Sequence, residues 1–142
     1  MKKVTYMIAL AILLVATAGC KKTPKPDPVP SCVGEWQLSQ IETKSVSYAG
    51  QTVDVYVSFL EEGTFELYQM VGQGRFRKYT GSWSLDGSVL SGTYSNKKAW
   101  GSTYQVSGEN GTLVLTSEKS GEVDTYRKTS IPESVKAEAY EL

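Results

Sequence analysis

The chain has 142 residues, of which 40% are apolar, 11% aromatic and 21% charged, and its 15 basic and 15 acidic residues leave no formal net charge. This is the composition of one ordinary globular domain, which excludes a disordered or collagen-like chain. The balanced charge gives no reason to expect a nucleic-acid partner. The sequence lacks histidine, the commonest general base and metal ligand, and its two cysteines are too few for a four-ligand zinc cluster. We therefore expect neither a metal site nor a cofactor.

Residues 1–19 have the features of a secretory signal peptide. Two lysines follow the initiator methionine, a mostly apolar run comes next, and small residues precede a cysteine at Ala18-Gly19-Cys20. The uninterrupted apolar part is short for a membrane span. The stretch resembles a bacterial lipobox, although Thr17 stands where Leu or Val is usual, so Cys20 is predicted to be acylated and to begin the mature chain. An ordinary signal peptide with an incidental cysteine and an uncleaved N-terminal anchor are the alternatives.

Residues 20–32 are predicted to tether this lipidated cysteine to the folded domain. Every second residue from 24 to 30 is proline, and alternating prolines hold a chain extended. Lysines in the tether are either solvated or lie against anionic lipid headgroups. The lysine directly after Cys20 resembles that of lipoproteins sorted to the outer membrane, and no acidic run favours the cell surface, so we expect anchoring at the periplasmic face. Cys32 then has no intrachain disulfide partner and is expected to be a small buried hydrophobe.

The rest of the sequence has the two-residue alternation that is typical of β-strands. Asp86-Gly87 and Asn110-Gly111 are strong hairpin signals. The predicted strands cover residues 36–42, 53–59, 65–69, 75–85, 89–94, 103–107, 112–117 and 122–128. A short helix is predicted after Pro132. The predicted fold is all-β, an eight-stranded antiparallel up-and-down barrel over residues 33–129 with a tail at 130–142. A two-sheet sandwich is the alternative, but its Greek-key crossings need longer connections.

The predicted connections differ between the two ends of this barrel. Those after the second, fourth and sixth strands are tight turns, whereas those after the first, third, fifth and seventh are longer or looser. One end is therefore expected to be pinched and the other rimmed by loops. Trp36 begins the first strand and Arg127 ends the eighth, so we expect them, with Gly34, to close the pinched end with the guanidinium over the indole.

Several short motifs in this part of the chain resemble one family. They are Gly34-x-Trp36-x-Leu38, Phe-Leu-Glu-Glu-Gly-Thr-Phe at 59–65, Gly-Ser-Trp-Ser-Leu at 81–85, Leu-Val-Leu-Thr at 113–116, and Tyr126-Arg127. In this order, behind a lipobox, they resemble the small lipocalin-like domains of bacterial lipoproteins. The chain is shorter than a full lipocalin and lacks its long helix and its Thr-Asp-Tyr motif. The resemblance implies a lipocalin-like barrel, and it supports the fold more than a function.

The leading functional hypothesis is a non-enzymatic, membrane-anchored protein that binds a small apolar or amphipathic ligand in the barrel. The candidate ligand-binding residues at the loop-rimmed end are Gln69, Arg77, Tyr79, Tyr94, Trp100 and Tyr104. Apolar walls are expected from Val55, Leu67, Leu90 and Leu115. An arginine and several phenols above an apolar floor suit an amphipathic anion such as a fatty acid.

Other readings of the same residues stay open. The tyrosines could simply fill the barrel, Trp100 could fold back onto it, and Arg77 could lie on a solvated strand edge. The protein would then be a structural or interaction module that docks a protein or glycan in the cell envelope. A ligand-binding cup needs an internal cavity of roughly 300 Å³ or more, which distinguishes the two hypotheses. Nothing predicts an enzyme, because the Glu61-Glu62 pair diverges at a turn and no nucleophile motif occurs.

Overall fold

A computed structural model describes residues 31–42 and 52–142, with side chains described for 31–39 and 52–142. The predicted signal peptide, Cys20, most of the tether and the 43–51 connection lie outside the described residues. The elements are β1 (Gly34–Glu42), β2 (Val53–Phe59), β3 (Thr64–Val71), β4 (Arg77–Asp86), β5 (Val89–Tyr94), β6 (Tyr104–Ser107), β7 (Thr112–Ser117), β8 (Val123–Lys128), the helix α2 (Glu133–Glu138) and the short strand β9 (Tyr140–Glu141).

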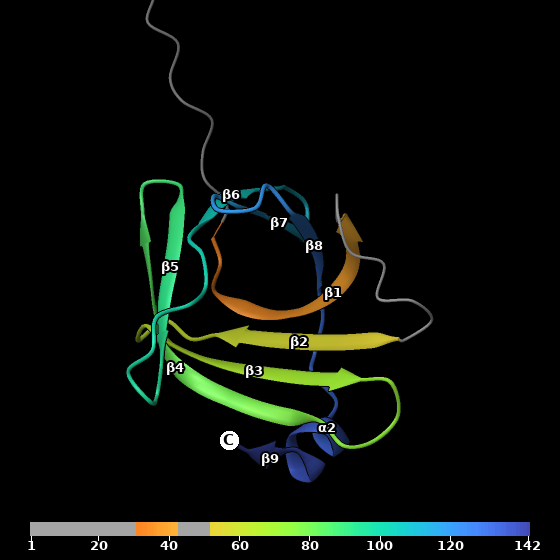
Figure 1. Cartoon of the computed structure of the whole chain (residues 1–142). Helices are drawn as coiled ribbons and strands as arrows, with labels where there is room; N and C mark the ends of the chain where they lie inside the picture. The colour runs from red at the N-terminus through yellow and green to blue at the C-terminus, as the bar shows by residue number, and fades with distance from the viewer. Residues whose placement is uncertain (1–30, 43–51) are drawn as a thin grey trace, which may run out of the picture.

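Strands β1 to β8 form a closed antiparallel barrel, which Figure 1 shows along its axis. Each strand pairs with its neighbour in the chain, and β1 pairs antiparallel with β8, which closes the ring. The predicted barrel is therefore confirmed, and the sandwich is excluded. Closure pairs each of these strands with a neighbour on both sides over at least part of its length.

Alternation along each strand explains why the sequence forms this barrel. In β2, Val55, Val57 and Phe59 are buried, whereas Asp54 and Tyr56 are only partly so. The predicted bounds of β2, β5 and β7 are those observed. The ends of the other five strands differ from the predicted ends by one or two residues; these strands are β1, β3, β4, β6 and β8. The helix α2 follows Pro132, as expected. β9 was not predicted.

The pinched end is filled by a core around Trp36. Its Nε1 donates a hydrogen bond of 2.8 Å to the Cys32 carbonyl, and Cys32 is buried as expected, which raises the pKa of its thiol to about 11. The prediction that Arg127 lies over Trp36 is wrong by one position. The register partner of Trp36 is Lys128, whose Nζ lies 5.7 Å from the centre of the indole. Arg127 points outward because it follows the inward-facing Tyr126.

β4 diverges from the barrel wall at Gly81. Its residues 81–86 pair with β5, whereas Arg77 and Lys78 pair in parallel with β9. A Cβ at Gly81 would overlap the Thr93 carbonyl oxygen, so only glycine allows β4 and β5 to approach this closely. The first half of β4 therefore leaves the barrel beside β3, and β9 covers its free edge (Figure 1).

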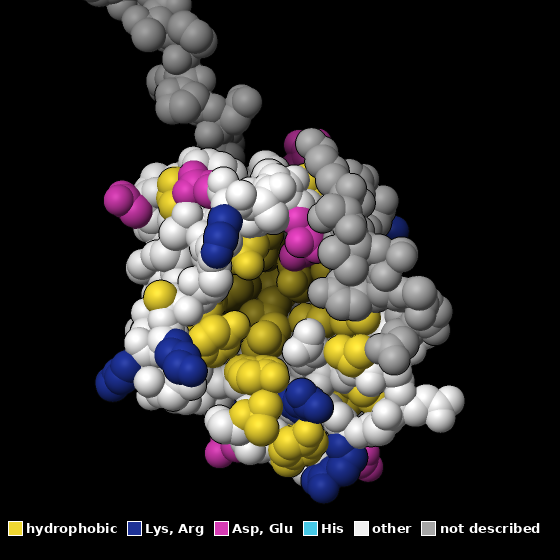
Figure 2. Space-filling view, viewed as in Figure 1, with side chains coloured by type: hydrophobic (Ala, Val, Ile, Leu, Met, Phe, Trp, Pro, Cys, Tyr) yellow, Lys and Arg dark blue, Asp and Glu magenta, His cyan; other side chains and the backbone are white. Residues whose placement is uncertain are grey.

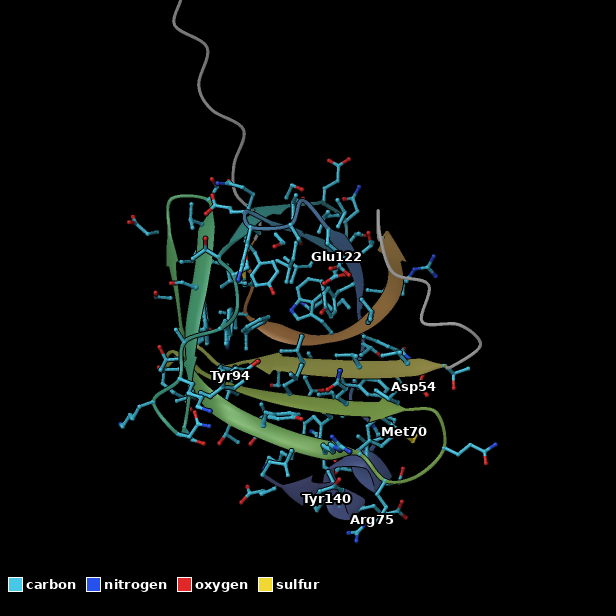
Figure 3. All side chains as sticks on the ribbon, viewed as in Figure 1. Asp54, Met70, Arg75, Tyr94, Glu122 and Tyr140 are labelled. Atoms are coloured by element: carbon cyan, nitrogen blue, oxygen red, sulfur yellow. The ribbon has the colours of Figure 1, made fainter. Side chains whose placement is uncertain are left out.

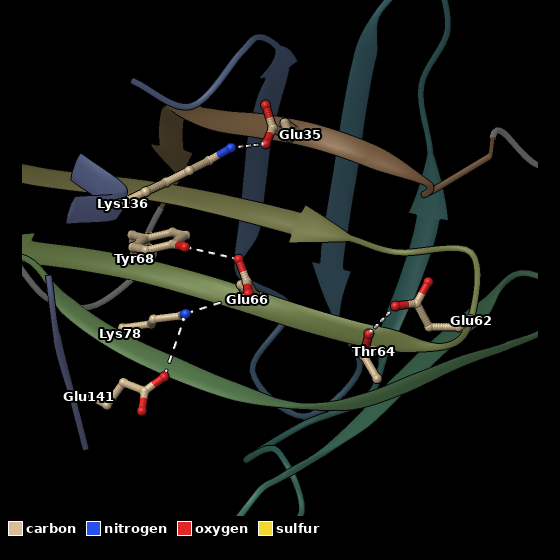
Figure 4. A network of polar contacts seen from close by, with 8 residues as sticks. All are labelled: Glu35, Glu62, Thr64, Glu66, Tyr68, Lys78, Lys136 and Glu141. Carbon is tan, nitrogen blue, oxygen red and sulfur yellow. Dashed lines mark hydrogen bonds and ion pairs between the residues drawn. The ribbon is translucent and has the colours of Figure 1, made fainter. Parts of the chain in front are cut away.

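The C-terminal segment packs on the outer face of the barrel. Ile131 and Val135 bury Tyr68 of β3 beneath α2. A polar network surrounds this contact (Figure 4): Lys136 Nζ lies 2.8 Å from a carboxylate oxygen of Glu35, and the Tyr68 hydroxyl donates to Glu66 at 2.9 Å. These contacts hold α2 against β1 and β3, away from the open end of the barrel.

Candidate functional site

The open end of the barrel holds a cavity of about 130 Å³. Figure 2 shows a hollow in this face with a hydrophobic floor. Its lining residues come from six of the strands and from the β5–β6 connection: Val57, Phe59, Phe65, Leu67, Tyr94, Trp100, Gly101, Tyr104, Leu115, Asp124 and Tyr126. The cavity is thus aromatic and aliphatic apart from phenol groups and one carboxylate.

Trp100 forms one wall of this cavity. The β5–β6 connection folds inward through a bridge between Thr93 and Ala99, and the Trp100 backbone N–H donates to the Gly92 carbonyl at 3.0 Å. Because Gly92 has no side chain, the indole lies directly on it. Its ring centre is 5.2 Å from that of Phe65, nearly perpendicular to it. Trp100 therefore folds back onto its own barrel, as one of the alternative readings predicted, and by doing so it shapes the cavity.

Two tyrosines complete the aromatic lining near the opening. The Tyr104 ring centre lies 6.2 Å from that of Trp100, and the Tyr94 ring centre lies 5.9 Å from that of Phe65. Figure 3 shows Tyr94 reaching from β5 at the open end. Burial raises the pKa of both phenols, and the negative charge of Asp124 adds to the effect at Tyr104. Both groups are therefore neutral hydrogen-bonding partners at physiological pH.

Asp124 is the site residue that the sequence analysis missed. It lies on β8 between Leu115 of β7 and Ile41 of β1, and its side chain lines the cavity. Burial, together with the negative charge of Glu122, raises the pKa of Asp124 to about 6. No hydrogen bond or ion pair to its carboxylate is found within residues 31–39 and 52–142. Its alternation with the inward-facing Tyr126 was the available signal, since residues two apart share a face.

Residues 33–115 match the profile of a known family, the lipocalin-like domain. The chain belongs to this family. A crystal structure of an uncharacterised protein from Bacteroides eggerthii is similar to the lipocalin-like barrel, with a TM-score of 0.55 and 19% sequence identity, and the match covers 70% of this chain and 100% of that one. At this identity the similarity supports the fold alone. Among curated proteins, none shows significant similarity to the chain.

The lipocalin-like barrel brings only part of the predicted site together. Tyr94, Trp100 and Tyr104 line the cavity, but Gln69 and Tyr79 do not. Gln69 and Tyr79 lie beside a second depression of about 410 Å³ at the edge of the diverging β4, bounded by exposed side chains of the β5–β6 connection. Of the predicted apolar walls, Leu67 and Leu115 line the cavity, whereas Val55 and Leu90 are buried in the core.

Arg77 does not reach the cavity. It sits on the part of β4 that leaves the barrel wall, and its Nε donates to the Tyr140 hydroxyl at 2.9 Å. Arg75 behaves similarly, because its guanidinium bonds the Glu138 carbonyl and lies 5.5 Å from the centre of the Tyr140 ring. Figure 3 shows Arg75 and Tyr140 together near the C-terminal segment. The predicted arginine above an apolar floor is therefore absent from the described lining of this lipocalin-like cavity.

Within 31–42 and 52–142, no helix is both long enough and apolar enough to span a bilayer. The same residues contain no group of three or more cysteines or carboxylates placed to hold a metal ion.

Proposed function

We propose that this lipocalin-like protein is a non-enzymatic, lipid-anchored protein of the bacterial cell envelope that binds a small ligand in the open end of its barrel. The observation that carries the proposal is the aromatic and aliphatic cavity bounded by Trp100, Tyr104 and Leu115. Binding sites of this kind are concave, mostly apolar and supplied with a few polar groups. Anchoring is supported by the lipobox-like sequence before Cys20 and by the proline-rich tether.

The volume of the cavity limits the size of the ligand. At about 130 Å³ it is below the roughly 300 Å³ expected of a site for a drug-sized molecule. It is close to the cavity of about 150 Å³ that holds benzene in an engineered protein. A fatty acid would leave most of its chain outside, and Arg77 is not there to bind its head group. A compact ligand of about benzene to indole size fits better.

Calorimetric titration of the full chain with phenol and indole tests this proposal. Saturable binding is expected for the wild type. Leu67→Phe, which adds volume inside the cavity, should weaken binding about tenfold or more. Leu60→Phe is the matched control, because Leu60 is exposed in the turn at the pinched end. Overpacking costs about 1 to 3 kcal/mol of stability, so folding of each variant is checked by circular dichroism.

A second candidate function is an interaction module with a filled barrel. Its support is the volume of the cavity, which at about 130 Å³ is below the roughly 300 Å³ expected of a ligand-binding cup. If the wild type binds none of the small probes, namely phenol, indole, choline and dimethylbutanol, the ligand-binding proposal is overturned and the docking module is retained.

A further inference from the structure

We infer that the natural ligand is a small organic cation, such as an amine or a quaternary ammonium compound, held between the Asp124 carboxylate and the aromatic rings of the cavity. The inference rests on the proposed function and adds the chemical class of the ligand. The sequence analysis expected an anionic ligand because of Arg77, whereas the ligand inferred from the structure is a cation.

The first argument is the charge inside the cavity. Among the described lining residues, Asp124 bears the only ionisable acid or base that is charged at neutral pH. Glu122 lies just before β8 at the same opening, where Figure 3 shows it, and its charge acts on Asp124. Lysines and arginines are missing from the described lining. Among the described residues, a cation inside the cavity would therefore lie closest to negative charge, and Lys98 lies in the neighbouring depression that shares Leu67 and Tyr94.

The second argument is the aromatic wall. Trp100, Tyr94 and Tyr104 surround the cavity together with Phe65, and the ring pairs meet at interplanar angles of 68° to 71°. Tilted rings of this kind enclose a compact volume rather than the flat slot of a parallel stack. The faces of Trp and Tyr rings attract cations, and aromatic cages bind quaternary ammonium groups in this way.

The third argument is the cost of a half-buried carboxylate that has no hydrogen-bond or ion-pair partner among the described side chains. Burial of a charge is unfavourable unless an opposite charge or hydrogen-bond donors compensate it. The titratable groups that face Asp124 in the described structure are Glu122, Tyr94, Tyr104 and Tyr126, and none of them is basic. Its neighbour on β7, Leu115, offers no donor in its side chain. A bound cation would compensate the part of this charge that the described residues leave to solvent.

Choline and its neutral isostere dimethylbutanol, in which carbon replaces nitrogen, form a matched pair of probes. Both are titrated calorimetrically into the full chain in an uncharged maltoside detergent. We expect choline to bind about tenfold more tightly than the isostere, because its ammonium gains Coulombic attraction to Asp124 and cation–π attraction to the rings. Asp124→Asn should remove this preference. Glu61→Gln, which removes one negative charge at the opposite end of the barrel, should keep it.

A pH series on the wild type gives a measurement that does not depend on any variant. The charge of choline is fixed, so a change in its affinity reports on the protein. Between about pH 5 and pH 8 the affinity for choline should rise about tenfold as Asp124 ionises, and that of the isostere should stay constant.

The possible results separate the inference from the proposed function. The inference is overturned if choline binds no more tightly than the isostere. It is also overturned if the preference for choline survives Asp124→Asn. Either result leaves ligand binding itself intact. If neither these probes nor phenol and indole bind, both the inference and the proposed function are overturned.

Discussion

The indole of Trp100 occupies the space that a side chain at Gly92 would need. A Cβ built at position 92 would overlap the six-membered part of the indole, and the backbone N–H of Trp100 donates to the carbonyl of the same glycine. One glycine in β5 therefore allows a loop residue to become a wall of the cavity. The chemistry of the open end depends on this contact.

Gly92→Ala should displace Trp100 from the cavity wall. The added methyl group meets the ring itself, so either the ring or the strand must move, at a cost of about 1 to 3 kcal/mol. Tryptophan fluorescence should shift to longer wavelength, and thermal unfolding should occur at a lower temperature. Gly101→Ala is the matched control, because a Cβ there has open space around it. Similar spectra for wild type and Gly92→Ala would show that the contact does not position the ring.

Lys128, rather than Arg127, should contribute to the closure of the pinched end. Lys128→Ala removes a cation from the face of Trp36, an interaction of about 0.5 to 1 kcal/mol at an exposed site. Arg127→Ala removes an outward side chain and should change stability by less than about 0.5 kcal/mol. Urea unfolding of the two variants compares them directly. A larger loss for Arg127→Ala would contradict the register argument.

Asp124→Asn should stabilise the protein at neutral pH. The pKa of Asp124 is raised to about 6 in the folded state, so the folded protein binds this proton more tightly than the unfolded chain does. Ionisation therefore destabilises the fold progressively as the pH rises from about 4 to about 6. The gain from Asn should be about 1 to 2 kcal/mol at pH 7, after allowing for solvent at the opening.

The pH dependence of that gain is the decisive measurement. Below about pH 3 the carboxyl is protonated in both states, so the advantage of Asp124→Asn should vanish. Glu61→Gln at the pinched end provides the control, for which no such gain is expected. A stability difference that is independent of pH would mean that Asp124 is not destabilised by burial.

Cys20→Ala should abolish acylation of the chain. The thiol is the group that a lipobox presents for modification, so the variant should take up no labelled palmitate and should leave the membrane fraction once the signal is removed. Cys32→Ala is the matched control and should be labelled like the wild type, since Cys32 is buried in the barrel core. Partition of processed Cys20→Ala with membranes would reject the lipoprotein proposal.

The strands could be predicted because their signals are local. Alternation in Val53–Phe59 and the turn residues at Asp86-Gly87 act over a few neighbouring positions, and the barrel follows once short connections leave no room for crossings. The family was recognised for the same reason, since its motifs lie within single strands and turns. Even the outward position of Arg127 follows from its alternation with the inward-facing Tyr126.

The site could be predicted only in part, because its geometry depends on contacts between distant segments. Arg77 was excluded from the cavity by the divergence of β4 at Gly81 and by the pairing of β9, a strand too short to leave a signal. Asp124 entered it because the closed barrel places one face of β8 opposite Trp100 and Tyr104. The sequence by itself determined which residues form strands and which face each one presents. Only the tertiary structure decided which faces meet across the barrel, because strand divergence and loop packing are set by contacts far apart in the chain.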